Sequence, residues 1–541
     1  MIILKKGFLL RGQAEGEIKT EAILRIIICI CMILVMGFLT MVSILHTTNV
    51  ADDETITYYN DNFILNLIVT GIFIAICFII LPVLKKVPLW AEIIFISLWT
   101  IILGLLWVYS SQASVAWDSG SVNNAALKAA ENDFSFLEER YFKDYSFQLG
   151  YVFFYEIIIR IASLFGEVTN FLFLEVGNVL FLTASYIAII LMNQRIFNNS
   201  QIQHLTVLIL AFGIQPIIFS SFLYGIIPGL AFALYAVYFE IIYLQDSKLQ
   251  YGLLSAVFIT IAIMIKSNYN IVMIAMMLFV LAKLFRRKQF IWDVLYIIVT
   301  VVFAFSVSPV VKNMYEHRSG IDLGDSIPYV CWISMGMNES WNAPGWYNYG
   351  FTVAAFENAG YDAEIASENA MRTIKERLKY FSEDAQYKQD FFYKKAVSQW
   401  NETSYESICL NKSMGSYSER KKIASWVLNN GEQKVKQFMD YYAQFIYVAV
   451  FIGAFICFRR KNLEQSIFLL IILGGFLYHL MSEAKSQYSM PYFICMMGFA
   501  PCGILCVCEF LKKKLEPVQQ KFKIIYKYKN IVTMLVKKSN T

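Results

Sequence analysis

The sequence predicts an all-α polytopic membrane protein with about twelve transmembrane helices. Three observations lead to this fold class. Of the 541 residues, 57% are hydrophobic and 16% are charged, whereas soluble globular domains carry about 25% charged residues. Apolar runs of about 20 residues, the length that crosses the hydrocarbon core of a bilayer, recur along the chain. Lysine and arginine gather in short loops between these runs, as they do in the cytoplasmic loops of membrane proteins.

Each predicted span is an apolar run that begins and ends near polar or charged residues. The first run is too long for the core of a signal peptide and no small-residue cleavage site follows it, so we expect it to be retained as a span. In chain order the spans cover residues 22–45, 62–84, 88–110, 170–192, 204–221, 224–243, 251–266, 269–284, 290–310, 440–457, 465–481 and 488–510.

The distribution of lysine and arginine predicts that both termini are cytoplasmic. The segment before the first span is basic, whereas the loop after it has acidic residues and no lysine or arginine. The Ile- and Lys-rich composition is typical of bacterial proteins, so the predicted location is a bacterial plasma membrane. The basic cytoplasmic loops and tail contain Lys85, Lys86, Arg195, Lys248, the clusters at 283–288 and 459–461, and Lys512–Lys514.

This assignment of sides requires that the apolar run Phe147–Gly166 does not cross the membrane. Counting it as a span would place Arg195 and every later basic loop outside. The run also carries Glu156 and Arg160, an (i, i+4) pair on one helical face. We therefore predict interfacial helices in the first outer loop.

The spans divide the chain into five segments. The large outer segment is predicted to be mixed and mostly helical, because Met371, Ile374, Leu378 and Phe381 recur at helical spacing. The segments are 1–87, a cytoplasmic segment with two extra spans; 88–310, a transmembrane core with first outer loop 111–169; 311–439, the extracytoplasmic region; 440–510, the C-terminal spans; and 511–541, a basic cytoplasmic tail.

Several function classes lack the residues that they require. The sequence has no P-loop and no dinucleotide fingerprint. The net charge of +5 comes largely from clusters at membrane ends, so we predict no nucleic-acid partner. No Cys or His group has zinc-ligand spacing, so we predict no metal and no cofactor, and a divalent cation stays an open alternative. Cys331 and Cys409 share the outer side, and the sequence leaves their pairing open.

Two acidic positions of the first outer loop are candidates for chemistry. Asp118 follows the third predicted span and adjoins Trp117, at a depth that suits a base acting on an acceptor hydroxyl. The alternative is that Asp118 caps the next helix. Asp144 is a second acidic candidate or a helix N-cap. Together with Tyr145 and Gln148 it is predicted to contact a sugar, although aromatic belts at interfaces are ordinary.

Two outer turns are candidates for binding a lipid phosphate. Lys266 and Asn268 lie in a turn between two spans, where a lysine opposes the inside bias and offers its charge to a phosphate. A snorkelling lysine is the alternative. The last outer turn is predicted to bind phosphate or sugar hydroxyls, or else to be a solvated connector. Its candidate residues are Glu483, Lys485, Gln487 and Tyr488.

Aromatic and amide residues crowd the start of the large outer region, which is typical of surfaces where ring faces stack on sugars. The alternative is that this loop packs on the membrane or on a small core of its own. The candidate substrate-binding residues here are His317, Arg318, Trp332, Asn338, Trp346 and Tyr347.

In the order of these features the chain resembles the GT-C superfamily of polytopic glycosyltransferases, especially the family 39-like protein-mannosyltransferase and aminoarabinose-transferase type. The likeness runs from about the third span to the end of the chain. It comprises the acidic first loop, the interfacial helices, the large outer region and the charged, Tyr- and Pro-containing last turn. The chain departs from the pattern at Ser146–Gln148, where relatives have a Pro-Pro-Leu-like motif, at Lys485, where an arginine is often found, and in its two extra spans.

The resemblance implies an inverting glycosyltransferase that moves a sugar from a polyprenyl-phosphate donor to a cell-envelope polymer, glycolipid or protein. Asp118 matches the superfamily's catalytic base, and Glu483–Pro491 resembles the turn that helps to hold the donor phosphate. The implied partners are this donor, the acceptor and the lipid bilayer. The alternatives are a transporter or flippase of a lipid-linked or polar solute, which does not explain the large outer region, and a non-catalytic assembly factor.

Overall fold

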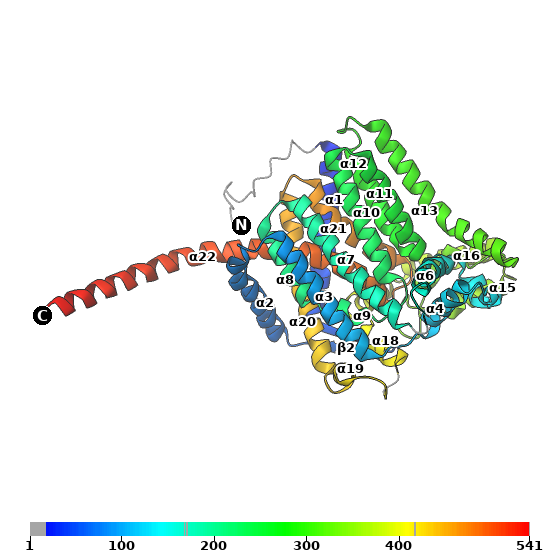
Figure 1. Ribbon diagram of the computed structural model, residues 1–541, viewed down its shortest axis with the longest axis horizontal. Helices are drawn as coiled ribbons and strands as arrows, with labels where there is room; N and C mark the ends of the chain where they lie inside the picture. Colours follow the sequence, from blue (N-terminus) through cyan, green and yellow to red (C-terminus); the bar gives the residue numbers. More distant parts are fainter. Residues whose placement is uncertain (1–17, 167, 169–170, 416–417, 540–541) are drawn as a thin grey trace.

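The computed structural model describes residues 18–539 apart from 167, 169–170 and 416–417, and beyond Pro517 it describes the backbone alone. It shows a helical membrane bundle with a helical outer region (Figure 1). Within the described ranges, nine helices are long and apolar enough to cross a membrane. They are α1 (Lys19–Leu45), α2 (Phe63–Leu84), α3 (Leu89–Ser111), α7 (Leu172–Phe197), α10 (Ile226–Asp246), α13 (Phe290–Ser319), α20 (Glu432–Arg459), the stretch Leu463–Met481 that contains α21 (Ile467–Met481), and the stretch Ser486–Pro517 that contains the first part of α22 (Met490–Ser539).

Three predicted spans correspond to shorter apolar helices. The run 204–221 is interrupted by Gly213 and Pro216, so it forms α8 (Ser200–Phe212) and α9 (Gln215–Phe219) in place of one long helix. The runs 251–266 and 269–284 form α11 (Leu249–Ile265) and α12 (Asn270–Lys283), joined through η3 (Ser267–Tyr269). Nine of the predicted spans are therefore confirmed by helix length and composition, and the count of twelve stays a prediction.

The basic loops meet at one end of the bundle, which we call the basic end. Arg25 donates to the carbonyl of Phe458 at 2.7 Å, and this contact joins α1 to the last turn of α20. Arg286, between α12 and α13, lies 3.2 Å from Glu21 at the start of α1. The cytoplasmic side of this end is a prediction, but the gathering of these loops at one end is what the charge pattern requires.

The first loop at the other end of the bundle forms an antiparallel hairpin that the sequence analysis did not predict. Strand β1 (His46–Val50) pairs with β2 (Ile56–Asn60) in the register His46↔Asn60 to Val50↔Ile56. The backbone of Thr48 also pairs with that of Glu402, so the hairpin is attached to the large outer region.

The first outer loop contains α4 (Trp117–Ala130), α5 (Arg140–Asp144) and α6 (Leu149–Ser163). Helix α6 is not among the helices that qualify as spans, and its interfacial position stays a prediction. The predicted (i, i+4) pair is confirmed, because Glu156 lies 2.9 Å from Arg160. Glu156 also lies 2.6 Å from Arg318, so this pair ties α6 to the end of α13.

Helix α13 continues beyond the predicted end of its span to Ser319 and ends at Gly320, which has φ +73°, while the predicted start of the outer region at residue 311 stays a prediction. Helix α16 confirms the predicted helix around residue 375, and Ile374 and Phe381 are buried as expected. The predicted face is wrong in part, since Met371 and Leu378 are exposed. The helices are α14 (Tyr329–Gly336), α15 (Val353–Asn358), α16 (Ala363–Glu383), α17 (Ala385–Trp400), α18 (Ser407–Met414) and α19 (Lys422–Ser425).

Candidate active site

A cavity of about 710 Å³ lies at the end of the bundle opposite the basic end. Its walls come from segments far apart in sequence: the hairpin tip, the start of α4, the segment before α6, the α9–α10 and α11–η3 turns, the start of the outer region, α18, and the last outer turn. Asp118 and Trp332 both line it, so the first outer loop and the aromatic-rich segment share one chamber.

The cavity brings together eleven of the sixteen predicted site residues. They are Asp118, Tyr145, Gln148, Lys266, Asn268, Trp332, Tyr347, Glu483, Lys485, Gln487 and Tyr488. Their roles stay predictions, but they share one chamber.

The other five predicted residues do not line this cavity. Asp144 is buried against Arg140, with which it forms an ion pair, and burial raises the pKa of its carboxyl. His317 is exposed near the end of α13, and the neighbouring Arg318 is paired with Glu156. Asn338 and Trp346 are buried in the outer region; the Asn338 amide donates to the carbonyl of Ser334 at 2.8 Å, and the Trp346 indole donates to Ser398 Oγ at 2.9 Å.

Asp118 lies in the first turn of α4 with its side chain exposed in the cavity. It does not cap α4, whose N-cap residue is Ala116. Trp117 before it has φ +48°, a left-handed conformation that is uncommon outside glycine and is often found at functional sites. Tyr224 donates its hydroxyl hydrogen to Asp118 Oδ2 at 2.9 Å and accepts from Gln148 Nε2 at 2.8 Å. This chain of hydrogen bonds fixes the orientation of the carboxylate.

Lys266 faces the same chamber from the turn between α11 and η3. Its ammonium nitrogen lies 3.5 Å from the ring centre of Tyr224 and 5.5 Å from that of Tyr488, so two aromatic faces hold it. Burial lowers the pKa of Lys266 to about 7, and the negative charges of Asp118 and Glu483 oppose this shift. A buried lysine between two aromatic rings does not reach out to water in the way that a snorkelling side chain does.

Lys485 in the last outer turn is bound to carboxylates. Its Nζ lies 2.6 Å from Glu54 at the hairpin tip and 3.7 Å from the fully buried Glu406. Although burial lowers it, the charges of Glu406 and Glu54 raise the pKa of Lys485 above its usual value. Glu406 also accepts from Ser486 Oγ at 3.0 Å. Lys485 therefore joins three segments of the cavity wall.

The other end of the same turn is attached to the outer region. Lys395 of α17 donates to the carbonyls of Gly336 and Ser482, the latter at 2.8 Å, and burial lowers its pKa to about 7. The backbone N–H of Ala484 donates to the carbonyl of Gly345 at 2.9 Å. These contacts hold the last outer turn against α14 and the loop that follows it.

Sequence reasoning missed several residues that build this site. Tyr224, Glu54, Lys395 and Glu406 carry no motif, and the acidic residues of the hairpin tip indicated only the side of the membrane. In the described part of the chain, no group of three or more His, Cys, Asp or Glu residues is arranged to hold a metal ion. Cys331 and Cys409, whose pairing the sequence left open, are both free.

Replacing Lys485 with Met is expected to lower the free energy of unfolding by about 3–5 kcal/mol, because Glu406 would stay buried without its cation. Thermal melting in one detergent measures this effect. The matched control is Lys379→Met, which removes a surface lysine 3.8 Å from Glu383 and is expected to change the stability by less than about 0.5 kcal/mol. Equal melting temperatures of the two variants would contradict the buried network.

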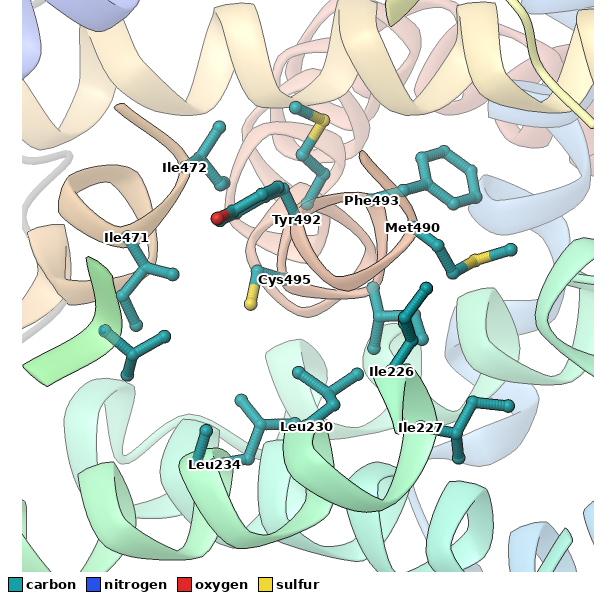
Figure 2. Packing of buried hydrophobic residues seen from close by; sticks show 14 of the residues in the cluster. Ile226, Ile227, Leu230, Leu234, Ile471, Ile472, Met490, Tyr492, Phe493 and Cys495 are labelled. Carbon is teal, nitrogen blue, oxygen red and sulfur yellow. The ribbon is translucent and has the colours of Figure 1, made fainter. Parts of the chain in front are cut away.

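A narrow apolar pocket of about 20 Å³ adjoins the cavity between α10, α12, α21 and α22. Lys266, Asn268 and Tyr488 line both spaces. Beyond them the pocket is apolar, and Figure 2 shows Leu230 and Leu234 of α10 opposite Ile471 of α21 and Cys495 of α22. The polar chamber and the apolar pocket therefore meet at Lys266.

The chain matches, over residues 18–503, the family described as conserved hypothetical integral membrane protein. Comparison with curated proteins gives no match. Two similar solved structures are of the oligosaccharyltransferase of Archaeoglobus fulgidus. The first is AglB in complex with an inhibitory peptide and a dolichol-phosphate, with 12% identity and a TM-score of 0.42 over 81% of this chain and 52% of that chain. The second is the apo form, with 12% identity and a TM-score of 0.39 over 82% of this chain and 52% of that chain. The chain thus spans about half the length of the structures that it matches.

Proposed function

We propose that this chain, which belongs to the family of conserved hypothetical integral membrane proteins, is a glycosyltransferase that takes a sugar from a lipid-phosphate donor. One observation carries the proposal: a polar chamber and an apolar pocket meet at a lysine. A lipid-linked sugar has the same three parts in the same order, namely a polar sugar, an anionic phosphate and an apolar tail, of which the pocket of about 20 Å³ has room for the first carbons alone.

The charges of the site suit a donor with one phosphate. Lys266 and Lys485 are the lysines that line the cavity, and Lys485 is already paired with Glu54 and Glu406. This leaves the ammonium of Lys266 for the phosphate. One cation balances the single charge of a phosphodiester, whereas a diphosphate would need more positive charge.

Asp118 is then the base of the reaction. Its carboxylate takes the proton of the acceptor hydroxyl, whose oxygen attacks the anomeric carbon from the side opposite the phosphate and inverts the configuration. The hydrogen bond from Tyr224 orients Asp118 and keeps one of its two oxygens for the acceptor. Positioning of this kind lowers the entropic cost of the attack.

Aromatic residues around the chamber suit a sugar. Tyr145, Trp332 and Tyr347 line it together with Trp117 and Trp341, which are exposed. Their ring faces offer apolar contact to the C–H groups of a sugar and exclude water from the reacting atoms. The acceptor class stays open between a cell-envelope polymer, a glycolipid and a protein.

Deleting the gene in the host is expected to cause a polyprenyl-phosphate sugar to accumulate, which mass spectrometry of the lipid extract would detect. Restoring the wild-type chain should remove it. Membrane-impermeant periodate, applied to spheroplasts, separates the proposal from a flippase. Loss of a transferase leaves the lipid-linked sugar on the outer face, where periodate oxidises it. Loss of a flippase leaves the lipid-linked sugar on the inner face, where it is protected from periodate. No change in lipid-linked sugars after deletion would refute both functions.

A further inference from the structure

The side chain of Glu483 lines the same chamber as Lys266, and the charges of the two groups interact. We propose that Glu483 is a second catalytic residue, which works in its protonated form and gives its proton to the phosphate oxygen that leaves the sugar. This inference rests on the proposed function, since it assigns a task in the same reaction. It differs from a plain binding role because the carboxylic acid and the carboxylate have opposite effects on a phosphate.

The backbone around Glu483 is held from several sides. The carbonyl of Ser482 accepts from Lys395 at 2.8 Å. The carbonyl of Glu483 itself accepts from Nδ1 of His479 at 2.7 Å. The N–H of Ala484 is bound to Gly345. The main chain is thus fixed while the half-buried carboxyl lines the chamber. Among the described residues, this carboxyl has no hydrogen-bond partner, so it is free to bind a ligand.

The charges around Glu483 come from several elements. Burial raises its pKa to about 7; Lys485 and Lys266 favour the ionised form, whereas Asp118 and Glu406 oppose it. Lys395 and Tyr488 also interact with this carboxyl. Below about pH 7 the Glu483 carboxyl is neutral and Lys266 is charged, so Lys266 attracts a phosphate and is opposed by Asp118 alone. Above that pH the Glu483 carboxyl is charged and Lys266 loses its proton, so two carboxylates repel the phosphate and Lys266 no longer attracts it.

The proposed step balances in atoms and charge. The bond between the anomeric carbon and the phosphate oxygen breaks, and its electron pair stays on that oxygen. The proton of Glu483 moves to the same oxygen, while the acceptor's proton moves to Asp118 as the new C–O bond forms. The products are the glycosylated acceptor and a lipid phosphate with one remaining charge. A proton passing from Asp118 to Glu483 through solvent restores the starting state.

The test measures binding of didodecyl phosphate to the full chain in nanodiscs from about pH 6 to about pH 8.5. This phosphodiester keeps one charge over the whole range, so any pH dependence comes from the protein. Above about pH 7 the wild type is expected to lose up to about a hundredfold in affinity per pH unit, because two protons are linked to binding. Glu483→Gln and Lys266→Arg should each lose about tenfold in affinity per pH unit, because one linked proton remains in each. The affinity of the double variant should not depend on pH in this range.

Gln copies the shape and neutrality of the protonated acid, so Glu483→Gln should bind as tightly as wild type at about pH 6. If Glu483→Gln keeps the full slope of the wild type, the role of Glu483 is wrong while the phosphate site stands. If didodecyl phosphate does not bind the wild type even at about pH 6, the proposed function itself loses its phosphate site. Should the double variant fail to fold, the comparison of the pH dependence of binding between the wild type and Glu483→Gln decides whether Glu483 has the proposed role.

Discussion

Asp118→Asn is expected to lower sugar transfer by about 10²–10⁴-fold, because the amide cannot accept the proton of the acceptor hydroxyl. The variant should fold normally, since Asp118 is exposed in the cavity and the amide oxygen can still accept from Tyr224. Transfer is measured first as removal of the lipid-linked sugar in the deletion strain. It is then measured on the purified protein with the lipid that accumulates there.

Asp133→Asn provides the matched control for this experiment. Asp133 lies in the same outer loop, and its carboxylate accepts from the N–H of Ser135 at 2.9 Å. Because it does not line the cavity, its amide variant should transfer the sugar at the wild-type rate. Wild-type turnover by purified Asp118→Asn would show that Asp118 is not the catalytic base. Equal loss in both variants would point to a disturbance of the loop.

Lys266→Met is expected to weaken binding of a lipid phosphate by about 10–150-fold. Met keeps the apolar stem but loses the cation, and a hydrogen bond to a charged group contributes about 1.5–3 kcal/mol. Binding of didodecyl phosphate in nanodiscs at about pH 6 measures the effect without any turnover. At this pH the lysine, whose pKa is about 7, carries its charge in the wild type.

Lys128→Met controls for a general loss of positive charge at this end of the molecule. Lys128 is 42% exposed and lies 3.8 Å from Glu139 in the first outer loop. We expect the Lys128→Met variant to bind didodecyl phosphate as tightly as the wild type. If Lys266→Met binds as tightly as Lys128→Met, the phosphate is bound elsewhere and Lys266 is not part of the phosphate site.

Sequence reasoning was most successful where one local property decides the structure. Asp118 follows an apolar run and Lys266 lies at the turn between two such runs, and both line the cavity. It was less successful where a side chain has a choice of partners. The sequence predicts that the turn with Lys485 binds phosphate or sugar hydroxyls or is a solvated connector, and this role stays a prediction. The structure pairs Lys485 with Glu54 and Glu406, and nothing in a single turn reveals that choice of partners.

The N-terminal spans show the same limit. They looked like additions to a core that begins at the third span. Their hairpin instead supplies Glu54 to the cavity wall, 431 residues before its partner Lys485. Residues such as Tyr224 and Lys395 were missed for the same reason, because their importance comes from neighbours that are distant in the chain.

By itself the sequence determined that this chain is an integral membrane protein. It also determined the positions of most of the spans and which loops lie at the same end of the bundle. Hydrophobic length and charge decide these properties, because a bilayer has a fixed thickness and a strong bias in the placement of lysine and arginine. Only the tertiary structure decided which charges neutralise one another and which stay available for a ligand. Such choices depend on distances of a few ångströms between segments whose packing no local pattern encodes.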